Sequence, residues 1–271
     1  TDRKNPLTWR SIVNRVWQYH FGRGLVETAN DFGEMGAQPT HPELLDWLAA
    51  TFLESGGSLK KLHRLIVTSA AYRQSAAWQE EFARKDADNL FLWRMNRTRL
   101  DAECVRDAVL QITGRLDLTM GGPSAQQFKL SPGIHVTPNV DYAAFDVDST
   151  AASRRSVYRF IFRTLPDPFM DSLDCADASQ LTARRNTSVT ALQALSMMNN
   201  AFMVRQSEHF AARLEASRRG LEPQIELAYE LALGRPPRKG EVRALAEYAR
   251  KHGLANTCRL ILNSNEFLFA N

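Results

Sequence analysis

A strong helical period near the start of the chain constrains its fold more than any other feature. Apolar residues recur at three- and four-residue steps from Trp9 to Phe21, which places them on one face of an α-helix. Gly22 and Gly24 follow, and glycine readily adopts the left-handed backbone that ends many helices. The pattern predicts a helix that buries one face and ends at Phe21.

A second helix is predicted shortly afterwards. The segment Asn30–Gly33 favours a turn, because Asn and Asp side chains bond to their own backbone. Thr40 and Glu43 have the spacing of a capping box, with Thr40 as the N-cap and Pro42 in the first turn. The apolar face of this helix comprises Leu44, Leu45, Leu48 and Phe52.

Helical patterns continue along the rest of the chain. Ser58 is a predicted N-cap, and Gly114 is predicted to end a helix over residues 98–113. A helix beginning at Thr187 or Ser188 and reaching Phe202 has apolar residues on more than one face, which predicts a central, buried position. The remaining predicted helices span residues 221–233, 239–251 and 254–263.

The middle of the chain lacks this helical period. Residues 119–153 are rich in Gly and Pro, and a loop of that length is usually functional or disordered. Residues 156–163 suit a helix or a strand, and helix is favoured. We expect an all-α, compact multi-helix fold with a long irregular loop in the middle. Its expected parts are a helical part (1–118), the loop (119–153) and a second helical part (154–271), packed as one unit.

Two short segments resemble one another. Arg64–Ser69 is followed by Tyr72 as Arg259–Ser264 is followed by Phe267, and a helix beginning with Glu43 or Glu241 precedes each. Either the two helical pairs share one local design, or two amphipathic helices are alike by chance.

Composition and charge limit the classes of function. The chain has 271 residues, of which 44% are hydrophobic, and a net charge of +4. Its charges are interspersed, which does not favour nucleic-acid binding. No apolar run approaches the ~20 residues of a membrane span. The chain lacks a signal peptide, but it begins without Met, so we expect it to be a piece of a longer protein.

Several polar residues are candidates for a site. His20 falls near the centre of the first apolar face, so it is either a buried structural histidine or a site residue. With Asp31, Arg99, Asp101 and Arg106 it could line a polar cleft suited to acid–base chemistry. Alternatively, the charged residues near Arg99 form structural ion pairs or a solvated helix face.

An anion site is a further candidate. Arg184 and Arg185 directly precede the helix predicted to begin at Thr187 or Ser188, and helix starts attract anions. Two guanidinium groups there could bind a sulfate, phosphate or carboxylate. In the alternative, both arginines pair with acids such as Asp174 or Asp177.

The cysteines show no metal or haem pattern. Cys104, Cys175 and Cys258 are far apart, and the chain contains neither CxxC nor CxxCH. We expect no metal and no cofactor in this chain. One disulfide and a free thiol, or three buried thiols, both remain open.

Long motifs in order along the chain resemble those of one family, the planctomycete-specific domain PSD-one, a domain of unknown function. They are Asn14–Val26, Asn30–Gly33, Thr40–Leu48, Arg99–Glu103, Arg106–Asp107, Arg184–Arg185, Leu192–Leu195 and Asn263–Phe267. The resemblance implies a domain at the C-terminal end of a large exported protein, often with a c-type cytochrome module. It therefore implies a periplasmic or cell-surface location and a haem-bearing neighbouring domain. The family has no assigned activity, so the resemblance identifies no catalytic residues in this chain.

Two functions follow as hypotheses. The first is an accessory domain that docks on neighbouring domains of the same polypeptide, with an anionic or sugar ligand as a further partner. The second is part of an oxidoreductase or carbohydrate-processing enzyme with the polar His/Asp/Arg cleft. The sequence leaves open whether the chain is an enzyme.

Overall fold

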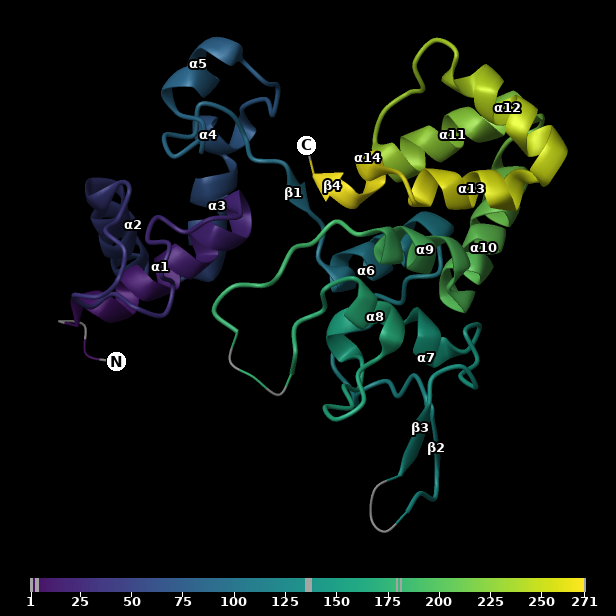
Figure 1. Cartoon of the computed structure of the whole chain (residues 1–271), viewed down its shortest axis with the longest axis horizontal. Coiled ribbons are helices and arrows are strands. Elements are labelled where there is room, and N and C mark those ends of the chain that lie inside the picture. Colours follow the sequence, from purple (N-terminus) through teal and green to yellow (C-terminus); the bar gives the residue numbers. More distant parts are fainter. Residues whose placement is uncertain (1, 3–4, 135–137, 179, 181, 271) are drawn as a thin grey trace. The chain divides into compact units, whose positions relative to one another are not determined.

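Two units make up the chain, residues 1–98 and 99–270, and each is described by itself (Figure 1). The computed structural model describes residues 2, 5–134, 138–178, 180 and 182–270. Helices dominate both units, and the few strands in the described residues are two or three residues long. The predicted multi-helix fold is confirmed. The boundary between Thr98 and Arg99 falls inside the expected N-terminal part and assigns the helix after it to the second unit.

Unit 1 is built on the helix predicted from the opening pattern. Helix α1 (Pro6–Phe21) ends at Gly22, whose φ of 76° confirms the predicted glycine stop. It packs on α2 (Pro42–Glu54) and α3 (Leu59–Val67) around a core that includes Val13, Trp17 and Phe52. Two short helices complete the unit, α4 (Ala70–Arg73) and α5 (Glu80–Lys85).

The loop after α1 is fixed by a residue whose role the sequence pattern does not reveal. Asn14 lies off the centre of the predicted apolar face, yet it is fully buried. Its Oδ1 accepts from the Val26 N–H at 2.8 Å, and its Nδ2 donates to the Val26 carbonyl at 2.9 Å. Both polar ends are thereby satisfied, which is the condition for burying an amide side chain.

One predicted cap is confirmed and one is wrong. The Ser58 hydroxyl accepts from the Lys61 N–H at 3.4 Å and caps α3. The capping box at Thr40 does not form, because the N-cap of α2 is His41 and it makes no side-chain cap bond. Thr40 instead bonds to the Leu25 carbonyl through its own N–H. The tertiary contact with the loop has replaced the local one.

Unit 2 surrounds a helical core in which α6 (Ala102–Thr113) and α10 (Ala201–Ser217) are central. Strand β1 (Thr98–Arg99) precedes α6, so the predicted helix begins later than expected but ends at Gly114 as predicted. The C-terminal helices match their predicted ranges within two residues. They are α11 (Leu221–Leu233), α12 (Glu241–His252) and α13 (Leu254–Leu262). A short helix that the sequence did not predict, α14 (Asn265–Leu268), and strand β4 (Phe269–Ala270) follow.

The middle segment contains more structure than predicted. Strands β2 (Lys129–Ser131) and β3 (Asn139–Asp141) pair antiparallel, with Leu130 opposite Val140. A short helix, α7 (Thr150–Ser153), follows, and the favoured helix over 156–163 is only a 3₁₀ turn at Ser156–Tyr158. Helix α8 (Pro168–Ser172) then returns the chain to the core.

The helix predicted from Thr187 or Ser188 is divided in two. Helix α9 (Ala191–Asn199) begins with a capping box in which Thr190 and Gln193 bond to each other's backbone. It stops at Asn200, which caps α10. The predicted central position holds for α10 but is wrong for α9, because Leu192 and Leu195 are exposed.

The two similar segments do share a local design. The Ser69 hydroxyl, after α3, accepts from the Tyr72 N–H, and the Ser264 hydroxyl, after α13, accepts from the Phe267 N–H, both at 3.2 Å. In each case the donor lies three residues after the serine. Each serine begins a four-residue helix, and each preceding helix has nine residues. One copy of this arrangement lies in each unit.

Candidate functional site

The residues expected to line a polar cleft are divided between the two units. His20 and Asp31 belong to unit 1, whereas Arg99, Asp101 and Arg106 belong to unit 2. Each group is therefore described within its own unit.

His20 is half-buried and faces a second histidine. Its Nε2 lies 2.8 Å from Nδ1 of His63 on α3, and its ring meets the ring of Tyr72 edge-on at 5.4 Å. Burial first, and then the nearby His63, lower the pKa of His20 below its usual value. His20 therefore lies against α3 and α4.

Asp31 has a local structural role. Its carboxylate accepts from the Gly33 N–H at 2.9 Å, which is the turn chemistry that the sequence predicted. The side chain is exposed. No contact between Asp31 and His20 is present in the described part of unit 1.

Arg99 and Asp174 form the first of three polar clusters in unit 2. Arg99 is buried, and its Nη1 lies 3.3 Å from Oδ2 of Asp174. Asp174 has a φ of 62° and also accepts bonds from the Ser188 N–H at 2.7 Å and the Gln193 side chain at 2.9 Å. Burial raises the pKa of Asp174, but these hydrogen bonds and the charge of Arg99 outweigh it and hold the pKa low.

The second cluster joins Arg185 to the start of α6. The Nη1 and Nη2 of Arg185 donate to the Glu103 carboxylate at 2.6 and 3.0 Å, and the Asp101 carboxylate lies 3.8 Å from the Nε of Arg185. Arg185 is therefore paired with acids, but these are Glu103 and Asp101, whereas the prediction named Asp174 or Asp177. Arg184 is exposed, and α9 begins at Ala191, so the predicted arrangement of two arginines at a helix start is absent.

The third cluster surrounds Arg106. This buried side chain donates to the carbonyls of Ala152 and Arg154, the latter at 2.9 Å, and lies over the Phe202 ring at 5.3 Å. Its neighbour Asp107 accepts from the Ser156 N–H at 2.7 Å. Burial, and then the charge of Arg159, lower the pKa of Arg106 to about 10, so it remains a cation at neutral pH.

The cysteines are free thiols. Burial raises the pKa of Cys175 to about 11 and that of Cys258 to about 12, so both are protonated at neutral pH. Across the described residues, no group of three His, Cys, Asp or Glu side chains could hold a metal ion. Arg99 and Arg185 are paired with carboxylates and Arg106 is held by backbone carbonyls, an arrangement typical of structural polar clusters.

Comparison with protein families adds one match. Residues 1–249 match the family PSD1, described as a protein of unknown function (DUF1553). The chain belongs to the PSD1 family. No curated protein and no solved structure matches it. The matched range covers all of unit 1 and unit 2 as far as α12, so the family is defined by both units.

In this PSD1 chain, the cluster around Asp174 fixes the start of α9, and apolar side chains beside it are exposed. Asp174 binds Ser188 and Gln193 on either side of Val189, and Gln193 and Met197 face inward from α9. The opposite face of α9 carries two exposed side chains, Leu192 and Leu195, and Val189, just before the N-cap Thr190, is exposed as well. We call these three residues the α9 face; the exposed fractions of Val189, Leu192 and Leu195 are 72, 63 and 57%.

None of the described helices is long and apolar enough to cross a membrane. Leu192 and Leu195 are three residues apart, so they lie on one side of the helix. The sequence alone pointed to apolar residues here, but it could not distinguish a buried face from an exposed one.

Proposed function

We propose that this PSD1 chain is a helical accessory domain that docks through the α9 face onto a neighbouring domain of the same, longer polypeptide. The observation that carries the proposal is the exposure of Val189, Leu192 and Leu195 on a segment that hydrogen bonds fix in place. Grouped exposed aliphatic side chains are typical of protein–protein contacts.

The backbone around α9 is fixed by hydrogen bonds, which suits this segment to docking better than a mobile loop would be suited. Thr190 and Gln193 form a complete capping box, and Asp174 binds both Gln193 and the adjacent Ser188. A pre-ordered surface loses little conformational entropy when a partner covers it. The partner that fits is an apolar patch, since the α9 face itself carries no charged side chain.

The resemblance to the PSD-one family supports a proposal about which domains neighbour this one in the longer polypeptide. We propose an exported protein, located in the periplasm or at the cell surface, with a c-type cytochrome module as the haem-bearing domain. This chain contains no CxxCH motif for covalent haem, so the haem would belong to the neighbour.

The alternative is an oxidoreductase or carbohydrate-processing enzyme with a polar cleft. The ion pairs of Arg99 and Arg185 favour a structural role for these residues, because their charges already have partners. The docking function is therefore the one that the geometry supports best.

Hydrogen exchange tests the docking surface. Amides of residues 189–199 should exchange more slowly in the longer polypeptide than in the isolated chain, and Leu192→Asp/Leu195→Asp should abolish that difference. Met120→Asp is the control, since Met120 is an exposed apolar residue elsewhere in unit 2. Equal exchange in the isolated chain and the longer polypeptide would contradict the proposal.

The haem-bearing neighbour needs a separate experiment. The full-length protein, purified from an exported fraction, should show the Soret absorption of a c-type haem, and the isolated chain should not. A full-length protein without haem would exclude the cytochrome association and leave the docking test unaffected.

A further inference from the structure

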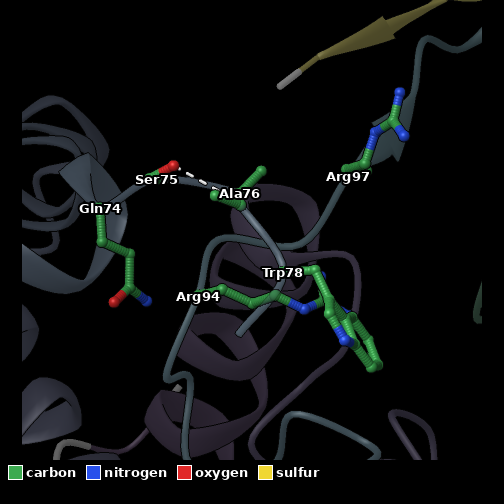
Figure 2. Close-up of a pocket in the computed structure, with 7 residues that line it drawn as sticks. Gln74, Ser75, Ala76, Trp78, Arg94 and Arg97 are labelled. Atoms are coloured by element: carbon green, nitrogen blue, oxygen red, sulfur yellow. Dashed lines mark hydrogen bonds between the residues drawn. The ribbon is translucent and has the colours of Figure 1, made fainter. Parts of the chain in front are cut away.

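A pocket in unit 1 lies apart from all the residues discussed so far. It has a volume of about 610 Å³, within the ~300–1,000 Å³ typical of small-molecule sites. Figure 2 shows its lining, which comes from the segment after α4 and from the return of the chain towards β1. The lining residues are Gln74, Ser75, Ala76, Ala77, Trp78, Arg94 and Arg97.

An exposed tryptophan forms the apolar wall. Trp78 is 61% exposed, an unusual state for so large an aromatic side chain. Its ring meets Trp93 edge-on at 5.7 Å, and its Nε1 donates to Glu80 at 3.1 Å. The indole is thus held at its edges, and its exposure leaves apolar ring surface for a ligand to pack against.

Arg94 lies beside this aromatic wall, as Figure 2 shows. Its guanidinium carbon is 5.6 Å from the centre of the Trp78 ring and 5.1 Å from that of Trp93. A cation–π contact leaves the N–H groups of a guanidinium able to donate hydrogen bonds to an anion.

The charge of Arg94 has no acidic partner. No carboxylate among the described residues lies within ion-pair distance of it, and its Nη1 reaches only the Met95 carbonyl at 3.3 Å. Its Nε is buried without a hydrogen-bond partner in the described structure. Arg97 adds a second cation to the lining. Arg94 differs in this respect from Arg99 and Arg185 of unit 2, which are paired with acids.

The segment that carries Arg94 is held in one conformation. Asn89 donates to the Arg94 carbonyl at 2.9 Å, and the Met95 N–H donates to the Ser75 carbonyl at 3.0 Å. Gln74 bonds to the Leu92 carbonyl, which joins the two sides of the pocket. The pocket is therefore formed before any ligand binds, which reduces the entropic cost of binding.

We propose that this pocket binds an acidic saccharide, a sugar ring that carries a carboxylate or sulfate group. The apolar face of the ring would pack on Trp78, and the anionic group would accept hydrogen bonds from Arg94. Gln74 and Ser75 supply amide and hydroxyl groups of the kind that bind sugar hydroxyls. The proposal stands independently of the docking function.

Calorimetric titration of the chain with matched sugars tests the proposal. The probes are glucuronate, glucose 6-sulfate, glucose and inorganic sulfate. We expect saturable binding of the two acidic sugars and at least about tenfold weaker binding of glucose and of sulfate alone. Trp78→Ala and Arg94→Gln should each weaken binding of the acidic sugars by about tenfold or more.

Matched variants provide the controls. Trp47→Ala changes an exposed tryptophan on α2, and Arg64→Gln changes an exposed arginine on α3, both outside the pocket lining. Neither should alter binding, and circular dichroism should show all four variants folded. Absence of binding, equal binding by all variants, or sulfate bound as tightly as glucose 6-sulfate would overturn the proposal.

Discussion

Arg185 binds Glu103 through two parallel hydrogen bonds, although 82 residues separate them in the sequence. The Cys175 thiol also contacts this carboxylate, at 3.8 Å. The pair fastens the segment before α9 to the first turn of α6, and therefore supports the α9 face from one side.

Glu103→Gln should destabilise unit 2 by about 1 kcal/mol, a value reduced for the partial exposure of the pair. Urea unfolding measures the change. Glu208→Gln, which alters the exposed pair with Arg205, is the control and should change stability by less than about 0.5 kcal/mol. Equal effects of the two substitutions would show that the Arg185 pair has no special importance.

The same carboxylate predicts a dependence on pH. The pKa of Glu103 is lowered, since the hydrogen bonds and charge of Arg185 outweigh burial. Its contribution to stability should be complete above the ordinary pKa of 4.5 and should be lost as the pH falls through the lower, folded-state value. Parent and Glu103→Gln unfolding curves should converge in that range, and a constant difference down to strongly acid pH would contradict this.

Asn14→Ala should be among the most destabilising polar substitutions in unit 1. It removes both bonds to Val26 and leaves a buried N–H and carbonyl without partners, at a cost of about 2–4 kcal/mol. Tyr19→Ala on the same helix should cost less than about 0.5 kcal/mol, because Tyr19 is exposed. Thermal unfolding compares the two, and similar melting temperatures would contradict the prediction.

The lowered pKa of His20 predicts a loss of stability in mild acid. Because the pKa of His20 is lowered in the folded state, the unfolded chain binds more protons below pH 6.5, and stability should fall as the pH drops through this region. His63→Ala removes the second cause of the shift and should raise the pKa of His20, as measured by NMR titration. An unchanged His20 titration would show that His63 does not influence it.

Arg106→Met should loosen the segment that follows the β2–β3 pair. The substitution keeps much of the apolar volume but leaves the carbonyls of Ala152 and Arg154 without their donor, at a cost of about 3 kcal/mol. Hydrogen exchange should accelerate at residues 152–156 more than in α12. Uniform acceleration throughout unit 2 would indicate global destabilisation instead.

Local chemistry alone determined where many helices begin and end. Gly22, Gly114 and Gly234 stop their helices, and Ser58 begins one, because these signals act on backbone groups within four residues. The repeated serine caps at Ser69 and Ser264 belong to the same class. Such contacts need no knowledge of the fold.

Tertiary structure decided what each polar or apolar face meets. Thr40 bonds to the Leu25 carbonyl and does not form its predicted cap, and Arg99 is paired with Asp174, 75 positions away in the sequence. Periodicity identified the apolar residues of α9, but burial depends on whether another element covers them, and the described structure leaves Leu192 exposed. The Trp78–Arg94 pocket could not be predicted from the sequence, because neither residue is part of a recognisable motif. Only the tertiary fold brings the Arg94 guanidinium over the Trp78 ring.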